Sequence, residues 1–179
     1  MPKSDMLYEA LLHLAQGRIV FPAVNKKPKV KWKDLISEPP NAKKVIQWFA
    51  DEDIHRGIAM ITGAASGGIF AVSIQGRVKT SSSILNLYAP DSTVYIQGDK
   101  YAAAFYKYPS KTIVGSGCYK YIDANGYEVK IRVCAENAYI GIPPSYFARS
   151  DKLKWIEKGP DAWDNLPTWN PINFIKQFA

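Results

Sequence analysis

The sequence has few of the residues on which most metal sites and nucleophilic sites depend. It contains two cysteines, Cys118 and Cys134, and two histidines, His13 and His55. Two cysteines alone cannot complete a four-ligand zinc site, although they could form one disulfide if they lay on neighbouring strands. Neither histidine has a recognisable nucleophile pattern around it, which argues against a catalytic triad. We therefore predict that both histidines are ordinary surface or boundary residues.

Long apolar runs are also missing. No stretch approaches 18 consecutive apolar residues, which excludes a membrane-spanning helix of the usual length. The first residues lead into an amphipathic segment and not into a continuous apolar one, so no secretory signal is predicted. With 179 residues, 47% of them apolar and 22% charged, the composition predicts one soluble globular domain over residues 1–179. The low cysteine content is typical of the reducing cytoplasm, where we expect the protein to act.

Positive charge is concentrated near the N-terminus. The chain has 23 basic and 16 acidic residues, a net charge of +7, and residues 1–50 alone hold 9 basic against 4 acidic residues. The centre of this excess is a proline-containing segment that reads as an exposed loop running into an extended stretch. Either it is a solubilising surface, or its lysines contact phosphates while the tryptophan stacks on bases or packs beneath them. The candidate residues are Lys26, Lys27, Lys29, Lys31, Trp32 and Lys33.

Periodicity predicts a mixed α+β fold in which a sheet is the main scaffold. Apolar residues spaced as on one helix face predict helices after Ser4 or Asp5 and after Asn41, the second burying Val45, Ile46, Trp48 and Phe49. Short strands are expected at 18–24, 57–62, 69–74, 93–97, 101–108, 117–122, 127–134 and 138–142. A last short helix should begin at Pro171. The turn at 63–68 is rich in glycine, but it has no Gly-Lys-Ser/Thr ending and a strand follows it, so it does not predict a nucleotide-binding P-loop.

Six segments in this order resemble the Prim-Pol domain of the archaeo-eukaryotic primase superfamily, found in plasmid and viral replication proteins. The segments lie at Ala10–Gly17, Val20–Pro22, the lysine–proline loop, Val45–Phe49, Ile58–Gln75 and Tyr139–Ser145, and a Leu166–Trp169 segment closes the match. The resemblance implies an RRM-like sheet with packed helices. It also implies a catalytic face with an acidic pair on one strand, a nucleotide-binding histidine on another and a third carboxylate before the Pro-Pro-Ser corner. Such acids hold Mg²⁺ or Mn²⁺, which prefer anionic oxygen ligands.

This sequence departs from that pattern at each position. The acidic pair aligns with Ser73 and Gln75, and the histidine aligns with Ala103. Glu128 is the nearest candidate for the third carboxylate, with Lys130 and Glu136 as other alignments. Since neutral ligands leave the charge of a divalent cation uncompensated, we predict no metal site, no intact catalytic residue and no cofactor.

Three functions follow as hypotheses. The first is a replication-associated domain without nucleotidyl transfer that binds DNA through the basic loop and the sheet cleft, assisted by Arg77, Lys79 and Lys107 and by Trp32 or Tyr101. The second is an active primase–polymerase whose Mg²⁺ or Mn²⁺ is held by displaced acids such as Asp99, Glu128 or Glu136. The third is a module that binds another replication protein. No membrane partner is expected, and the sequence does not define an oligomeric state.

Overall fold

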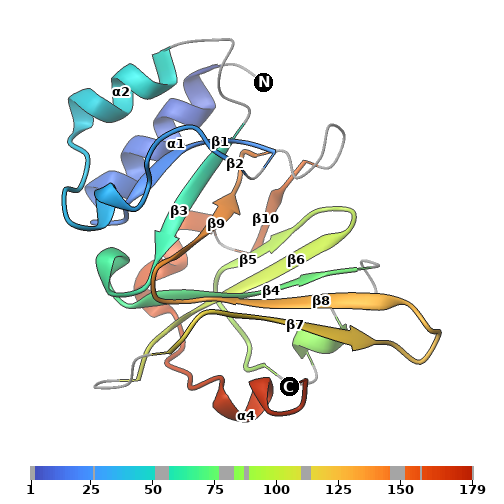
Figure 1. The fold of residues 1–179 in the computed structure, drawn as a ribbon. Helices are drawn as coiled ribbons and strands as arrows, with labels where there is room; N and C mark the ends of the chain where they lie inside the picture. Colours follow the sequence, from blue (N-terminus) through green and yellow to red (C-terminus); the bar gives the residue numbers. More distant parts are fainter. Residues whose placement is uncertain are drawn as a thin grey trace.

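In the computed structural model, the strands are divided between two antiparallel sheets; the two N-terminal helices lie beside the smaller sheet, and the C-terminal helix lies on the face of the larger sheet that is turned away from it (Figure 1). The structure describes residues 3–25, 27–50, 57–76, 83–86, 89–109, 114–145, 152–157 and 159–178. The smaller sheet has the order β2-β1-β3-β9 and the larger one the order β10-β5-β6-β4-β8-β7. The α+β class predicted from the sequence is confirmed, but its strands form two sheets where one was expected.

The eight predicted strands are all present within two residues of their expected bounds, whereas β2 and β10 were not predicted. The smaller sheet consists of β1 (Val20–Val24), β2 (Lys27–Pro28), β3 (Ile58–Thr62) and β9 (Ala138–Ile142). The larger sheet consists of β4 (Ile69–Gln75), β5 (Tyr95–Gln97), β6 (Tyr101–Lys107), β7 (Gly117–Ile122), β8 (Glu128–Cys134) and β10 (Lys154–Glu157). The helices include α1 (Lys3–Ala15), α2 (Ala42–Ala50) and α4 (Ile172–Ile175), with a helical segment at 83–86 and shorter 3-10 turns at Asp34–Ile36, Ala64–Ser66 and Gly159–Asn165. No helix of the described residues has the length and apolar character needed to cross a membrane.

Apolar side chains fill three layers. One cluster lies between the two sheets and includes Met60, Phe105 and Ile140, with α1 and α2 packed against it. A second covers the other face of the larger sheet, where α4 contributes Phe174 (Figure 1). A third covers the outer face of the smaller sheet. The alternation of side chains along each strand thus sends one set between the sheets and the other set outward.

In helix α2, a local signal sets the first residue of the helix, and tertiary packing determines which side chains are buried. The side chain of Asn41 accepts a hydrogen bond from the Lys44 backbone N–H at 2.9 Å, which confirms Asn41 as the N-cap. Val45 and Phe49 are buried as predicted, whereas Ile46 is 46% exposed, so its predicted burial was wrong. Among the described residues of this helix, the stripe carrying Val45, Trp48 and Phe49 is the part that packs against the buried clusters.

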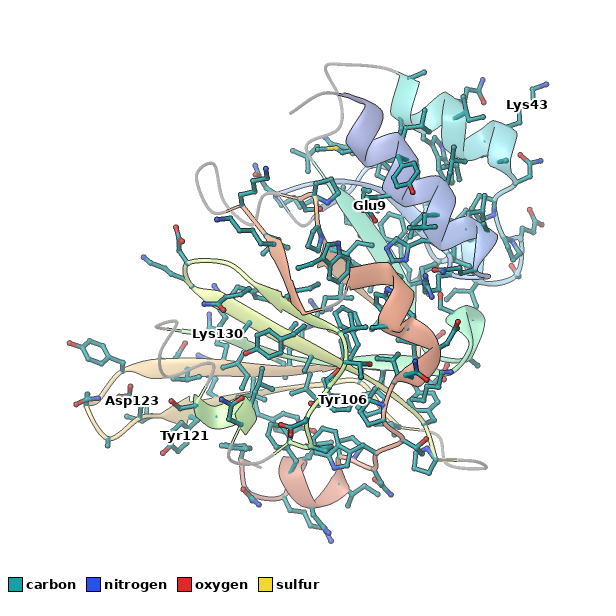
Figure 2. All side chains as sticks on the ribbon, turned by 180° about the vertical axis from the view of Figure 1, so that it is seen from behind. Glu9, Lys43, Tyr106, Tyr121, Asp123 and Lys130 are labelled. Carbon is teal, nitrogen blue, oxygen red and sulfur yellow. The ribbon has the colours of Figure 1, made fainter. Side chains whose placement is uncertain are left out.

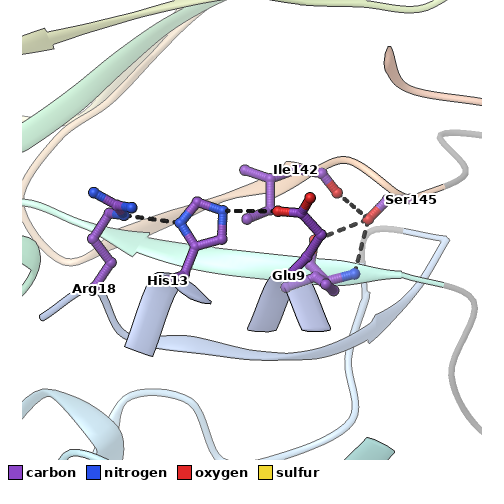
Figure 3. A network of polar contacts seen from close by, with 6 residues as sticks. Glu9, His13, Arg18, Ile142 and Ser145 are labelled. Carbon is purple, nitrogen blue, oxygen red and sulfur yellow. Dashed lines mark hydrogen bonds and ion pairs between the residues drawn. The ribbon is translucent and has the colours of Figure 1, made fainter. Parts of the chain in front are cut away.

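His13 is fully buried, so the prediction of a surface or boundary residue was wrong for this histidine. His55 lies outside the described residues. The Arg18 Nε donates a hydrogen bond to His13 Nδ1 at 2.8 Å, and His13 Nε2 lies 3.9 Å from Glu9 Oε2 (Figure 3). The guanidinium of Arg18 also lies over the Trp163 ring, 4.6 Å from its centroid. Burial, with the charge of Arg18, lowers the pKa of His13 to about 3, so the imidazole is neutral near pH 7. The contacts of His13 and Arg18 hold α1 against the residues before β1 and against the segment before α4.

The corner after β9 is fixed by the buried Ser145. Its hydroxyl oxygen accepts from the Ile58 backbone N–H at 2.8 Å, and the hydroxyl lies within hydrogen-bond distance of the Ile58 and Ile142 carbonyl oxygens (Figure 3). A Cβ on Gly57 would lie 2.7 Å from this oxygen, so the hydroxyl requires a glycine there. The corner of the Pro-Pro-Ser segment is therefore attached to the first residue of β3.

Ser145→Ala is expected to lower the free energy of unfolding by about 2 kcal/mol, because the Ile58 N–H would remain buried without its acceptor. Ser37→Ala serves as the control, since that exposed hydroxyl makes one bond to the Asp34 carbonyl and its loss should cost less than about 0.5 kcal/mol. Urea unfolding of the two variants measures the difference. Equal destabilisation by both changes would contradict the proposed role of Ser145.

Candidate functional site

The sheet register brings the three positions of the implied catalytic face together. In the β4–β6 pairing, Ser73 lies directly opposite Ala103, and Gln75 lies opposite Tyr101. Directly opposed residues of antiparallel strands project from the same face, as do residues two apart on one strand. Ser73, Gln75 and Ala103 are therefore neighbours on the face of the larger sheet that meets the smaller sheet.

A cavity of about 120 Å³ lies over this face, between the two sheets. The larger sheet contributes Ser73, Gln75 and Tyr101 to its walls, and the smaller sheet contributes mainly apolar groups such as Ile58 and Ile140. Ser73 is 5% exposed and its hydroxyl lies 3.4 Å from the Arg132 carbonyl oxygen, to which it donates. The cavity therefore combines an apolar wall with a wall of neutral polar side chains.

The neighbouring strand β8 adds positive charge to the same cavity. Arg132 lies opposite Ser73 in the β4–β8 pairing, and Lys130 lies opposite Gln75. Both side chains line the cavity. Figure 2 shows Lys130 on the opposite face of the β7–β8 hairpin from Tyr121, as the register requires. Each neutral position on β4 thus has a cation beside it on β8.

Sequence reasoning did not identify Lys130 and Arg132 as binding residues. Their local signal is clear, because residues 128–134 alternate polar and apolar side chains up to Val133 and the polar set comprises Glu128, Lys130 and Arg132. That signal predicts a strand with one charged face. It does not predict that this face lies beside Ser73, since the two strands are far apart in sequence.

The next strand, β7, adds a third cation beside Lys130. Lys120 lies directly opposite Lys130, and an opposed pair of like charges destabilises a sheet. Glu128 relieves this repulsion, with its carboxylate 3.0 Å from the Lys120 Nζ and 3.6 Å from the Lys130 Nζ. The hydrogen bond from Lys120, together with the charge of both lysines, lowers the pKa of Glu128. Three cations and one carboxylate leave this surface with a net charge of +2 (3 − 1).

The donor set of the cavity does not fit a divalent metal ion. Ser73 and Gln75 are neutral, and the nearest charged groups, Lys130 and Arg132, would repel a dication. Among the residues that the structure describes, no group of three or more histidine, cysteine, aspartate or glutamate side chains could hold a metal.

The acids considered as displaced ligands are used elsewhere or lie outside the cavity lining. Glu128 binds the two lysines, and the Glu136 carboxylate accepts from the Ala64 backbone N–H at 2.9 Å, at the turn between β3 and β4. Asp99 lies in the turn between β5 and β6 and does not line the cavity. The described acids therefore do not restore a ligand set at Ser73 and Gln75.

Two buried ionisable groups of the cavity, Tyr101 and Cys134, are neutral near pH 7. Burial raises the pKa of Tyr101 above its ordinary range and raises that of the Cys134 thiol to about 11. Cys118 and Cys134 do lie on the neighbouring strands β7 and β8, but both are free thiols, so the disulfide considered from the sequence does not form. Neither Tyr101 nor Cys134 therefore offsets the charge of Lys130 and Arg132.

The basic loop adjoins the cavity through aromatic packing. Trp32 is half-buried and stacks on Phe21 at a ring-centroid distance of 6.4 Å, and its centroid lies 5.0 Å from that of Tyr139. Tyr139 also lines the cavity, where the Arg132 guanidinium lies 5.8 Å from its ring centroid. Trp32 therefore packs beneath the loop, while the lysine side chains that the structure describes there are exposed: Lys27, Lys29, Lys31 and Lys33.

The other predicted binding residues lie elsewhere. Lys107 is at the end of β6 remote from Tyr101, and its Nζ lies 3.5 Å from the Asp164 carbonyl oxygen, so it does not line the cavity. Lys26, Arg77 and Lys79 fall outside the described residues. The structure thus separates a cavity with two cations from an adjacent loop with four exposed lysines.

Comparison with known proteins adds one finding. A family model described as the bifunctional DNA primase/polymerase N-terminal domain, Prim-Pol, matches residues 10–169, which is most of the chain. No curated protein matches the chain.

Proposed function

The chain belongs to the Prim-Pol family, the N-terminal domains of bifunctional DNA primase/polymerases, and on that premise we propose that it binds nucleic acid without transferring nucleotides. The family gives the chain a replication-associated, primase/polymerase-like role. In this function, the exposed loop lysines and the cation-lined cavity contact phosphates. The domain serves as an accessory to the replication of a plasmid or virus. DNA, single-stranded or in a primer–template, is the proposed partner.

One observation carries this proposal. Each of the two positions aligned with metal-binding acids, Ser73 and Gln75, is neutral and has a cation directly opposite on β8. Two-metal catalysis of phosphoryl transfer needs anionic ligands that offset the charge of the ions, and these residues do the reverse. Positive charge at the same place still attracts a phosphate, which supports binding without chemistry.

A primer-extension assay with Mg²⁺ or Mn²⁺ tests the absence of catalysis, and no template-directed incorporation is expected. Incorporation that Glu128→Ala abolishes would establish the active alternative instead. Binding to a replication protein without any affinity for DNA would favour the protein-interaction alternative.

Binding to a single-stranded oligonucleotide is expected to weaken steeply as the salt concentration rises, since each neutralised phosphate releases counterions. The double variant Lys29→Gln/Lys31→Gln should reduce the slope of log affinity against log salt by about 1.4, at about 0.7 per contact. Fluorescence anisotropy measures both slopes. Lys43→Gln/Lys44→Gln removes the same charge from α2 and should leave the slope unchanged. Salt-insensitive binding, or equal effects of the two double variants, would contradict the role of the loop.

A further inference from the structure

The cavity between the sheets has the charge and the donors of an anion site. Arg132 and Lys130 line it, and among the described residues no carboxylate forms an ion pair with Arg132. Glu128, which pairs with Lys130, does not line the cavity. An anion entering it would meet two cations, one of them without a competing carboxylate.

The neutral side chains favour a ligand with several acceptor oxygens. The Gln75 amide can donate, and the Ser73 hydroxyl can do so by turning its single O–H from the Arg132 carbonyl, 3.4 Å away, toward a bound anion. The guanidinium of Arg132 presents a planar set of N–H donors. A phosphate group offers acceptors in several directions and pairs with guanidinium through two parallel hydrogen bonds. The opposite wall, formed by Ile58, Ile140 and Leu153, carries no polar side-chain group that would compete for these donors.

The cations are also spaced to contact more than one phosphate. Arg132 and Lys130 are two residues apart on β8, about 6.6 Å along the strand, and Lys120 lies opposite Lys130. Arg132 lies beside the buried Ser73, but its own side chain is exposed, as are those of Lys130 and Lys120. The three cations therefore follow one another along the open side of the cavity and onto the surface of the hairpin. A ligand with consecutive phosphates can follow this row.

We propose that the cavity binds consecutive phosphate groups without a divalent metal, with Arg132 and Lys130 as the counter-cations and Ser73 and Gln75 as neutral donors. This inference rests on the proposed function and names the chemistry of its binding site. The phosphates belong either to a nucleic-acid backbone or to a free polyphosphate such as that of a nucleoside triphosphate.

Calorimetric titration with inorganic tripolyphosphate in EDTA tests the proposal. Binding is expected in EDTA, and Mg²⁺ should not strengthen it. Lys130→Gln and Arg132→Gln should each weaken binding by about 10- to 100-fold, because each removes a charge-assisted hydrogen bond. Lys43→Gln is the matched control, since Lys43 lies on α2 away from the cavity and its exposed side chain can be changed without loss of fold (Figure 2). Binding that requires Mg²⁺, or that all three changes weaken equally, would overturn the proposal.

A fluorescent single-stranded oligonucleotide in the same EDTA buffer identifies the source of the phosphates. If tripolyphosphate displaces the oligonucleotide and the Arg132 change weakens both ligands, the cavity holds the nucleic-acid backbone. If the Arg132 change weakens only tripolyphosphate, the cavity takes a free polyphosphate and the loop holds the oligonucleotide. If the oligonucleotide binds through the loop lysines while tripolyphosphate does not bind at all, the metal-free site is wrong and the proposed function remains. If the unmodified protein does not bind the oligonucleotide at all, the proposed function is wrong.

Discussion

Manganese is expected not to bind measurably to the double variant Ser73→Asp/Gln75→Glu, although this change restores the acidic pair. Each introduced carboxylate would lie directly opposite a cation, Arg132 or Lys130, and would form a cross-strand ion pair with it. A unit positive charge about 6 Å from a dication costs roughly 5 kcal/mol at an effective dielectric constant of about 20. The scaffold therefore opposes metal binding even when the ligands are present.

Removing the cations from that variant should reverse the result. Addition of Arg132→Ser and Lys130→Ser, with Ala103→His to complete the implied set, is expected to raise Mn²⁺ affinity at least about a thousandfold. Calorimetry or electron paramagnetic resonance measures the affinity. Arg132→Ser/Lys130→Ser without the acids is the control and should not bind the ion. Equal Mn²⁺ affinity with and without the β8 cations would show that their charge does not act on the cavity.

The second large effect is a loss of stability in mild acid caused by His13. The folded protein keeps this imidazole neutral, with a pKa of about 3, whereas the unfolded chain protonates it near 6.5. The unfolded state therefore binds more protons between these values, and stability falls as the pH decreases through that window. By pH 3, the free energy of unfolding is lowered by on the order of 4 kcal/mol through this group. Of this, about 2 to 3 kcal/mol is lost between pH 7 and pH 4.5, where most carboxylates are still ionised.

Urea unfolding at pH 7 and pH 4.5 measures this contribution. His13→Gln should be less stable at pH 7, but it should lose much less stability on acidification than the unmodified protein does. His55→Gln removes the only other histidine of the chain and should keep the full acid sensitivity. If the acid sensitivity followed His55 and not His13, the buried Arg18–His13 contact would not be its source.

The limits of the sequence-based prediction are clear at His13 and at β8. The helix carrying His13 could be predicted from the spacing of Leu7, Leu11 and Leu14, but the burial of the imidazole depends on Trp163, which is distant in the sequence. The strand β8 and its charged face follow from local alternation. Its position beside β4 follows from a pairing between segments that are distant in the sequence. The neutral residues Ser73 and Gln75 were therefore predicted, but the cations opposite them on β8 were not.

Other local features were predictable because they depend only on nearby atoms. The Asn41 cap belongs to this class. So does the turn at Asp123–Gly126, since an Asn-Gly pair in a tight hairpin favours positive φ at both residues, although only Gly126 adopts it here. The Asp123 carboxylate accepts from the Asn125 and Tyr127 backbone N–H groups, which sets the shape of the hairpin tip.

The position of Tyr139 gives the protein an optical reporter of its own cavity. Its ring contacts Trp32 and also borders the Arg132 guanidinium, so the indole is one side chain removed from the cation. An anion that draws the guanidinium away from the Tyr139 ring changes the polarity around that aromatic pair, and the emission of Trp32 should respond. Occupancy can then be followed without a dye or label, provided that the signal disappears in Trp32→Phe.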